Sequence, residues 1–502
     1  MYSYLIPADY LPTARPEAAG NPLLEALPPL MSADDTNLLL SFGRRPTYSD
    51  DERMLSAGER MLCVGRLNDY LLMMASHGEI IEQIGLILDS GYVHRNPALP
   101  EFQRSLVEFY RQRLQGRITP IESSGPSTAP SFALFGVSGM GKSTVVERTL
   151  SFYPRALSHE KYGFYQIVWM KIDCPMDGSL KQLLLSIVAK VDSTLGTNHS
   201  KSVNGRVPTD KLILDVAKIA AQHHLGVLVI DEVQHLLAAK GVGMEKLLNF
   251  FVTFTNDVKV PIIVLGTPKA KVHLEQLFRE ARRVGQYGSA LWDRMALGRE
   301  WDYFLKVLWK YQWLQKAEDL SPEVSEAMYH QTQGITALVI RLFQLVQLQA
   351  IRGKSERITV SLINKVAKEK FSLLRPALDA LRSGDNDRIA KFEDLISSGV
   401  TTLKTLTTQQ QAVQSIKVAE KRLNERRIQL TSNLLHAGAS PSIVGALVDE
   451  VLTPSGTTTP AKKSPPKVPN KLIEALRKAE AENADPVDAL RSAGLIDDLV
   501  GQ

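Results

Sequence analysis

Short apolar runs alternate with amphipathic segments through the middle of the chain. Four of these runs have the length of strands, and the segments that follow them have the spacing of helices. The apolar runs are Phe132–Val137, Tyr165–Ile172, Leu225–Ile230 and Val260–Gly266. Helices are expected to begin near Lys142, Ser179, Thr209, Met244 and Lys269. Strands that alternate with helices predict an α/β fold with a parallel sheet covered on both faces.

Helical patterns lie on both sides of this α/β region. Before it, six prolines fall within the first 29 residues, and helical spacing then appears over Tyr70–Ile87 and Glu101–Leu114. After it, residues 300–371 are expected to be helical apart from a short RITV stretch, and a helical hairpin or small bundle is expected over 409–451. Residues 452–470 are rich in Pro, Thr and Lys and bury too little to order themselves, which predicts a flexible tether.

These patterns predict six parts along the chain. They are a mostly helical N-terminal region (1–121), an α/β core (122–298), a helical lid subdomain (299–372), a helical extension (373–451), a linker (452–470) and a helical tail (471–502). The tail ends in an apolar and acidic segment, which suits docking to a partner protein at high effective concentration. Packing of the tail on its own helices is the alternative.

Composition excludes several classes of protein. With 44% hydrophobic and 23% charged residues the chain has the make-up of a globular protein, and its net charge of +5 is too small for a basic coat on nucleic acid. Its two cysteines, Cys63 and Cys174, have no CxxC spacing, which argues against a disulfide scaffold or a structural zinc site. No apolar run approaches the ~20 residues of a membrane helix, and the N-terminus lacks the pattern of a secretion signal. We therefore expect a cytoplasmic protein with no membrane partner.

The segment GVSGMGKS, Gly136–Ser143, carries the strongest chemical signal. It matches G-x-x-x-x-G-K-[ST], follows an apolar strand and opens a helix, which is the context that a phosphate-binding loop requires. Backbone N–H groups and the helix N-terminus would hold the phosphates of ATP. Lys142 is expected to reach the β and γ phosphates, and the Ser143 hydroxyl to bind Mg²⁺. The predicted nucleotide-binding residues are Gly136, Val137, Ser138, Gly139, Met140, Gly141, Lys142, Ser143, Thr144 and Asp231.

Two carboxylates directly follow the apolar run LGVLVI. Asp231 is expected to hold Mg²⁺ together with Ser143, and Glu232 to polarise the attacking water. A kinase would more often lack the second carboxylate, whereas an ATPase that uses its own hydrolytic water needs it. The pair therefore favours an enzyme that hydrolyses ATP to ADP and phosphate.

Three further side chains are candidates for the catalytic machinery. Thr267 follows the next apolar run and could hydrogen-bond the attacking water or the γ-phosphate, although a simple turn at the strand end is the alternative. Arg282 and Arg283 lie beyond the sheet, where one of them could reach the nucleotide of a neighbouring subunit and stabilise transition-state charge. A solvated basic helix end is the alternative for both arginines.

The nucleotide motifs resemble those of AAA+ ATPases, and further segments resemble TnsC-type regulators of DNA transposition. The resemblance covers roughly residues 20–395. It rests on NPLLEALPPL (21–30), GYVHRNP (91–97), KIDCPMDGSLK (171–181), LVIDEVQHL (228–236), MEKLLNFFVTFTN (244–256), LGTPKA (265–270), ARRVGQYGSALWD (281–293) and PALDALRSGDNDRIAKF (376–392). The resemblance implies an AAA+ P-loop ATPase core with a helical lid. One departure from the family pattern concerns the lid. Many AAA+ lids carry a sensor arginine close after a glycine, whereas here the first arginine after Gly334 is Arg341, two helical turns later.

The resemblance also implies a function and partners. TnsC-like proteins of bacteria bind double-stranded DNA when loaded with ATP, and they form rings or helical filaments. They link a target-selector protein of the TnsD or TniQ type to the transposase and endonuclease subunits. Lys181, Lys190 and Lys201 are candidate DNA contacts, although each taken singly is a typical solvated lysine. An AAA+ initiator or loader-like ATPase, or a nucleotide-switched scaffold outside transposition, is the alternative.

Overall fold

The structure is a computed structural model, and it describes part of the chain. The described residues are 4–32, 42–114, 120–121, 128–237, 242–271, 274, 289–385, 388–389, 425, 429, 431 and 448. Contacts divide the chain into two units, one of Met1–Met54 with Val64–Thr405 and one of Leu55–Cys63 with Leu406–Gln502. Among the described residues, no helix is both long and apolar enough to cross a membrane.

The larger unit is built on a five-stranded sheet in the order β5-β6-β7-β2-β8, in which all neighbours are parallel. Its strands are β2 (Phe132–Gly136), β5 (Trp169–Asp173), β6 (Val227–Asp231), β7 (Ile262–Gly266) and β8 (Ser289–Trp292). The three strands β2, β6 and β7 are buried along their whole length. A parallel strand inside a sheet is covered on both faces, which is why these strands are continuous apolar runs.

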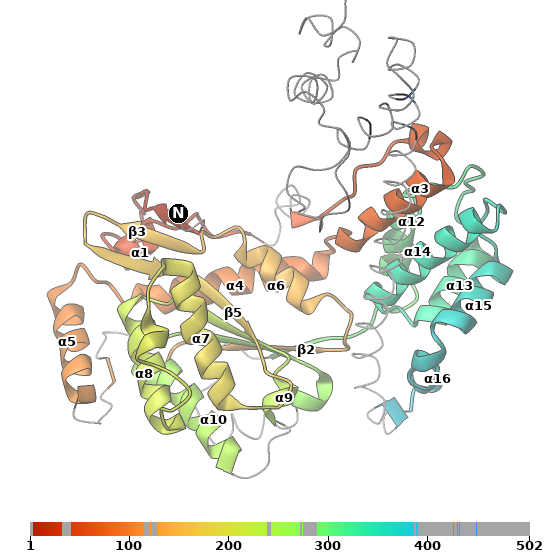
Figure 1. The fold of residues 1–502 in the computed structure, drawn as a ribbon. Coiled ribbons are helices and arrows are strands. Elements are labelled where there is room, and N and C mark those ends of the chain that lie inside the picture. The colour runs from red at the N-terminus through yellow and green to blue at the C-terminus, as the bar shows by residue number, and fades with distance from the viewer. Residues whose placement is uncertain are drawn as a thin grey trace, which may run out of the picture. The chain divides into compact units, whose positions relative to one another are not determined.

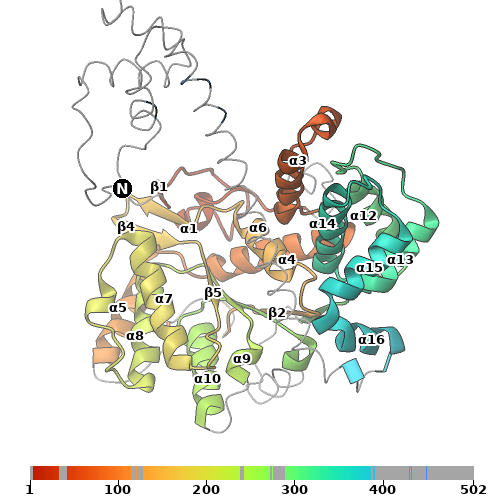
Figure 2. The same ribbon diagram turned by 45° about the vertical axis from the view of Figure 1, so that its right-hand side comes forward.

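Helices cover both faces of this sheet, because successive side chains along β6 point alternately to its two faces and are buried on each. Leu228 and Ile230 pack on one face, against α7 (Leu180–Leu195), α8 (Thr209–Gln222) and α10 (Val242–Val252). Val227 and Val229 pack on the other face, against α1 (Pro22–Glu25), α4 (Ala75–Val93) and α6 (Lys142–Leu150). Figures 1 and 2 show α7, α8 and α10 together on one side of the sheet, and α4 beside α6 on the other.

Local sequence accounts for several helix ends. The Ser179 hydroxyl accepts a hydrogen bond from the N–H of Gln182 and so caps α7, which ends at Leu195 and is followed by Gly196 in the left-handed conformation. The shorter elements of the same region are η3 (His199–Lys201), α9 (Gln234–Leu237) and η4 (Thr253–Asp257). The helix α5 (Pro100–Leu114) packs against α8.

The lid subdomain is a group of helices that follows the sheet in sequence. Within the predicted bounds 299–372 its helices are α12 (Arg299–Trp309), α13 (Pro322–Thr332), α14 (Thr336–Arg352) and α15 (Val360–Lys370). The short turn η5 (Ser372–Leu374) then leads to α16 (Arg375–Ser383), which lies in the predicted extension 373–451. Trp301 and Trp313 are fully buried in the lid. The RITV stretch is not a strand, because Thr359 caps α15.

A second, three-stranded sheet lies near the N-terminus in the order β1-β3-β4. Its strands are β1 (Leu5–Pro7), β3 (Ala156–His159) and β4 (Phe164–Ile167), and β1 pairs with β3 in parallel. The short turns η1 (Asp50–Met54) and η2 (Gly65–Asp69) lie in the N-terminal part of the chain between β1 and α4, whereas β3 and β4 follow α6.

Two sequence expectations about elements are wrong. The apolar run Tyr165–Ile172 is two strands rather than one, because β4 ends at Ile167 in the small sheet and β5 starts at Trp169 in the large one. Apolar character alone does not tell which partner a strand pairs with. The helix expected from Tyr70 begins at Ala75, because Leu71 instead forms a two-way backbone bridge with Arg44.

The smaller unit contains most of α3 (Ala57–Val64). Ser56 precedes this helix, and its hydroxyl accepts a hydrogen bond from the N–H of Glu59 at 3.4 Å, while the Glu59 carboxylate accepts from the N–H of Ser56 at 3.3 Å, which is the capping-box arrangement. The predicted linker 452–470 and tail 471–502 lie outside the described residues, as does nearly all of the hairpin expected over 409–451.

Candidate nucleotide-binding site

The predicted phosphate-binding loop connects β2 to α6 at the carboxyl edge of the large sheet. Gly139 and Gly141 have φ values of 88° and 97°, in the left-handed region that favours glycine. A side chain at Gly136 would place its Cβ 2.1 Å from the carbonyl oxygen of Trp292 on β8. Two different constraints therefore require glycine here: backbone conformation at Gly141, and close approach of the neighbouring strand at Gly136.

The ammonium group of Lys142 is held over the loop. Its Nζ donates to the carbonyl oxygens of Gly136 (2.7 Å) and Val137 (3.1 Å), and the residue is 8% exposed. A charged donor this close to the loop is placed to bind phosphate oxygens.

Asp231 and Glu232 lie at the end of β6, between β5 and β7. One carboxylate oxygen of Asp231 accepts from the N–H of Glu232 at 2.9 Å, and the other pairs with Lys171 Nζ at 3.0 Å. Glu232 has a left-handed backbone with φ 55°, and its carboxylate accepts a hydrogen bond from Gln234 Nε2. The orientation of Glu232 is therefore constrained by the backbone and by Gln234.

Lys171 is a charged residue of this site that sequence reasoning missed. It is the one charged side chain in the apolar run Tyr165–Ile172, and that was the available signal. Burial by itself would lower the pKa of Lys171, but attraction to Asp231 and hydrogen bonds to Asp173 and Asp231 outweigh burial and raise that pKa. Lys171 is thus a permanent cation beside Asp231.

Thr267 follows β7 directly and is 3% exposed. Its Oγ1 is buried and has no hydrogen-bond partner among the described residues, and the same holds for Oε1 of Gln234. A Cβ built on Gly266 would lie 3.4 Å from that Gln234 oxygen, so Gln234 adjoins the end of β7. Buried polar atoms without partners cost about 1–3 kcal/mol each. A bound water would relieve this cost at either atom, and a phosphate oxygen would relieve it at the Thr267 hydroxyl, which can donate.

A cavity of about 340 Å³ adjoins the loop. This volume is in the range of small-ligand pockets. Three separate parts of the chain line it: the N-terminal region, the loop with α6, and the lid. The lining includes Leu67–Leu72 and His77, Gly139–Gly141 with Thr144 and Glu147, and Phe304 with Thr336–Leu338 and Arg341. Burial lowers the pKa of His77 to about 4, so its ring is neutral near pH 7.

The lid contacts the loop directly. The hydroxyl of Thr336 and the N–H of Ala337 both donate to the carbonyl oxygen of Gly139, each at 2.9 Å. Arg341 lines the cavity and donates to Asn68 Oδ1 at 3.3 Å, and burial lowers its pKa to about 10. Arg341 therefore lies at the cavity that the loop lines, although it follows Gly334 by two helical turns rather than directly.

The donor set fits a magnesium ion. Lys171 contacts Glu147 (3.1 Å) as well as Asp231, and Glu147 is one helical turn after Ser143 on α6. The Ser143 side of α6 therefore faces Asp231. The described residues contain no group of three or more His, Cys, Asp or Glu around a metal position, so these residues alone do not enclose an ion. Magnesium held by one or two protein oxygens and by nucleotide phosphates needs no more than this.

The predicted DNA contacts are not brought together. Lys181 lies in the first turn of α7, and Lys190 in its second half, where burial and the charge of Arg155 lower the pKa of Lys190. Lys201 lies beyond the other end of α7, in η3. Arg282 and Arg283 lie outside the described residues.

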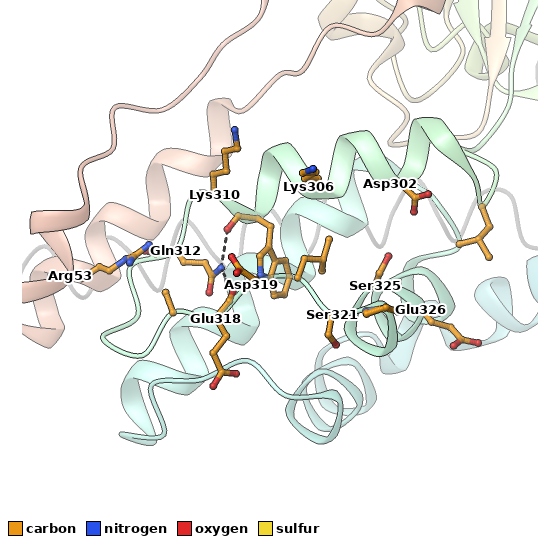
Figure 3. A pocket seen from close by; sticks show the side chains of 15 residues that line it. Arg53, Asp302, Lys306, Lys310, Gln312, Glu318, Asp319, Ser321, Ser325 and Glu326 are labelled. Carbon is orange, nitrogen blue, oxygen red and sulfur yellow. Dashed lines mark hydrogen bonds between the residues drawn. The ribbon is translucent and has the colours of Figure 1, made fainter.

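A second cavity, of about 810 Å³, lies in the lid between α12 and α13. Figure 3 shows Lys306 and Lys310 on one side of it and Ser321, Ser325 and Glu326 on the other. None of the predicted site residues lines this cavity.

One family model and several solved structures are similar to parts of the chain. Residues 124–273 match the family model of an AAA domain, and no curated protein matches the chain. Among solved structures, a Walker-type ATPase of Pyrococcus abyssi is similar at 17% identity, over 57% of this chain and 75% of that one, with a TM-score of 0.35. The ORC1 protein of Aeropyrum pernix in complex with DNA is similar at 13% identity, over 66% and 87%, with a TM-score of 0.35. Drosophila ORC bound to DNA is similar at 12% identity, over 68% and 84%, with a TM-score of 0.32. The predicted fold class is confirmed: the chain has the AAA+ P-loop ATPase fold, a parallel sheet between helices with further helical segments.

Proposed function

We propose that the protein binds ATP with Mg²⁺ and hydrolyses it to ADP and phosphate. The observation that carries this proposal is the meeting of the glycine loop, Lys142 and the Asp231–Glu232 pair at one edge of the sheet, beside a cavity of nucleoside size. In this proposal the cavity takes the nucleoside, and the loop takes the phosphates.

Each polar group then has a role in hydrolysis. Ser143 and Asp231 would hold Mg²⁺, which when bound neutralises phosphate charge. Lys142 exchanges its bonds to Gly136 and Val137 for bonds to phosphate oxygens. Glu232 accepts a proton from the attacking water, and the Thr267 hydroxyl bonds that water or the γ-phosphate. The unpartnered Thr267 Oγ1 supports this last assignment.

Substitution of Lys142 tests nucleotide binding. In Lys142→Ala the affinity for a fluorescent ATP analogue, measured by anisotropy, is expected to fall by about 100-fold or more, because a charge-assisted contact to phosphate is lost. Lys211→Ala, at an exposed lysine on α8, is the matched control and keeps wild-type affinity. Wild-type affinity in Lys142→Ala would show that nucleotide does not bind at this loop.

We further propose that ATP loading drives assembly on double-stranded DNA, and that the assembly links a target selector to a transposase and its endonuclease partner. The resemblance of residues 20–395 to TnsC-type regulators supports this finer role. An initiator-like AAA+ ATPase fits the fold equally well. The similar ORC1 protein of Aeropyrum pernix and the Drosophila ORC are themselves bound to DNA in those structures.

DNA binding and the two roles are tested separately. Anisotropy of a labelled duplex is expected to rise with a non-hydrolysable ATP analogue and much less with ADP, and equal binding in both states would contradict a nucleotide-dependent assembly. An integrase-like transposase that co-purifies with the protein in the presence of ATP would favour the transposition role. Capture of a replicative helicase instead would favour the initiator-like role.

A further inference from the structure

Lys171 joins three carboxylates from three different elements. Its Nζ lies 3.0 Å from Asp231 Oδ2 on β6, 2.7 Å from Asp173 Oδ1 on β5 and 3.1 Å from Glu147 Oε1 on α6. The side chains of Lys171 and Asp231 are 11% and 6% exposed, whereas those of Glu147 and Asp173 are 53% and 71% exposed. The pair with Asp231 is therefore the buried one, and the other two carboxylates face solvent.

This arrangement places a fixed positive charge beside the predicted magnesium position. Asp231 is the residue that would hold Mg²⁺, and one of its carboxylate oxygens is already bonded to the N–H of Glu232. The other oxygen is the one that Lys171 contacts. A cation that binds at Asp231 must therefore share that carboxylate with the ammonium group.

We propose that Lys171 is a positioning residue that acts as the resident counter-cation of Asp231 and weakens the binding of Mg²⁺ to the nucleotide-loaded site. This inference rests on the proposed function, since it requires that ATP and Mg²⁺ bind here. Before the nucleotide arrives, the ammonium neutralises a nearly buried carboxylate and holds its orientation. When Mg²⁺ binds, the two cations repel each other across the shared carboxylate.

The size of the effect follows from electrostatics. A monovalent and a divalent cation a few ångströms apart change affinity by about tenfold even under the screening of bulk water, and by more where water is excluded. Removal of the charge at position 171 should therefore tighten Mg²⁺ binding. A purely structural ion pair predicts no such change, because its loss would affect stability alone.

The test measures how strongly Mg²⁺ and nucleotide binding are coupled. The dissociation constant of a fluorescent non-hydrolysable ATP analogue is measured with EDTA and with saturating Mg²⁺. The readout is the ratio of the value in EDTA to the value in Mg²⁺. In Lys171→Met we expect this ratio to rise about tenfold, whereas Lys171→Arg keeps the charge and changes it by less than about twofold. Lys211→Met is the matched control, and its ratio should equal that of the wild type.

A double-mutant cycle tests whether Lys171 acts through Asp231. In an Asp231→Asn background, Lys171→Met should change the ratio by less than about twofold, because without the Asp231 carboxylate Mg²⁺ is no longer held a few ångströms from position 171. A ratio that is unchanged or lowered in Lys171→Met alone overturns the inference, and so does a tenfold rise that persists in the Asp231→Asn background.

Folding and binding failures remain distinguishable. If Lys171→Met alone unfolds, an uncompensated Asp231 is the expected cause, and the double variant should melt close to Asp231→Asn because it buries neither charge. An unfolded double variant would overturn the inference. A wild-type protein that binds no ATP analogue with or without Mg²⁺ refutes the proposed function itself, whereas normal coupling with no effect of Lys171 refutes the inference only.

Discussion

Replacement of Thr267 by valine should stabilise the nucleotide-free protein and impair hydrolysis at the same time. The Thr267 side chain is buried at the end of β7, and its hydroxyl has no partner among the described residues. Valine has nearly the same shape as threonine, so Thr267→Val removes the hydroxyl without a cavity. A site built for stability alone would carry valine here.

The magnitude follows from the cost of an unsatisfied buried hydroxyl. That cost is about 1–3 kcal/mol, and partial relaxation around the hydroxyl makes the lower end the fair expectation. We therefore expect a gain of about 1 kcal/mol in the free energy of unfolding. For a unit of this size, such a gain raises the melting temperature by about 2 °C.

Thermal melting without nucleotide and phosphate release with ATP together test this reasoning. Thr267→Val should melt about 2 °C higher than the wild type and hydrolyse ATP at least about tenfold more slowly, because a donor to the transferred phosphate or its water is lost. Thr267→Ser keeps the hydroxyl but leaves a small cavity, so it should melt lower and retain most activity. A Thr267→Val protein that melts below the wild type would mean that the Thr267 hydroxyl has a hydrogen-bond partner in the nucleotide-free protein, which would refute the expected gain in stability.

Three further predictions concern the same site. Glu232→Gln should bind ATP with wild-type affinity and release phosphate about 100-fold more slowly, and a normal rate would remove the assigned role of Glu232. Gly141→Ala places a side chain at φ 97° where no atom lies within 4 Å, so the empty loop should relax away from this conformation. Restoring it to bind phosphate costs about 1–2 kcal/mol, which should weaken ATP binding about tenfold by anisotropy, whereas unchanged binding would show that the empty loop keeps this conformation. If an arginine acts between subunits, a protein with both Arg282→Ala and Arg283→Ala, mixed with Lys142→Ala protein, should regain partial ATPase activity. Wild-type activity of the double-arginine variant alone at every concentration would contradict that role.

The parts of the site that could be predicted from the sequence are those made by neighbours in the chain. The loop Gly136–Ser143 and the pair Asp231–Glu232 are contiguous, and the apolar strand before each is a local pattern. The strands β2, β6 and β7 agree with their predicted runs to within two residues at each end. Local patterns suffice here because a buried parallel strand must be apolar on both faces.

The parts that could not be predicted depend on contacts between distant segments. Lys171 is bound by carboxylates from three elements, and no spacing relates it to Glu147 or Asp231. The strand β8 has the burial of an edge strand, with Ser289 and Leu291 exposed, and its apolar run of Ala290–Trp292 is too short to predict a strand. The contribution of His77 and Asn68 to the cavity depends on how the N-terminal region packs, which periodicity does not encode.

This packing makes the N-terminal region part of the proposed nucleotide site rather than an appendage to it. On α4, Ile81 and Ile84 are buried in the same core as Val229 of β6. Asn68 accepts a hydrogen bond from Arg341 of the lid, while Gly139 of the loop accepts two from the first turn of α14. A nucleotide that fills the cavity would therefore contact three segments that already touch one another. Its binding free energy can then be shared among the lid, the loop and the N-terminal region, which is the physical requirement for nucleotide state to influence any partner that binds that region.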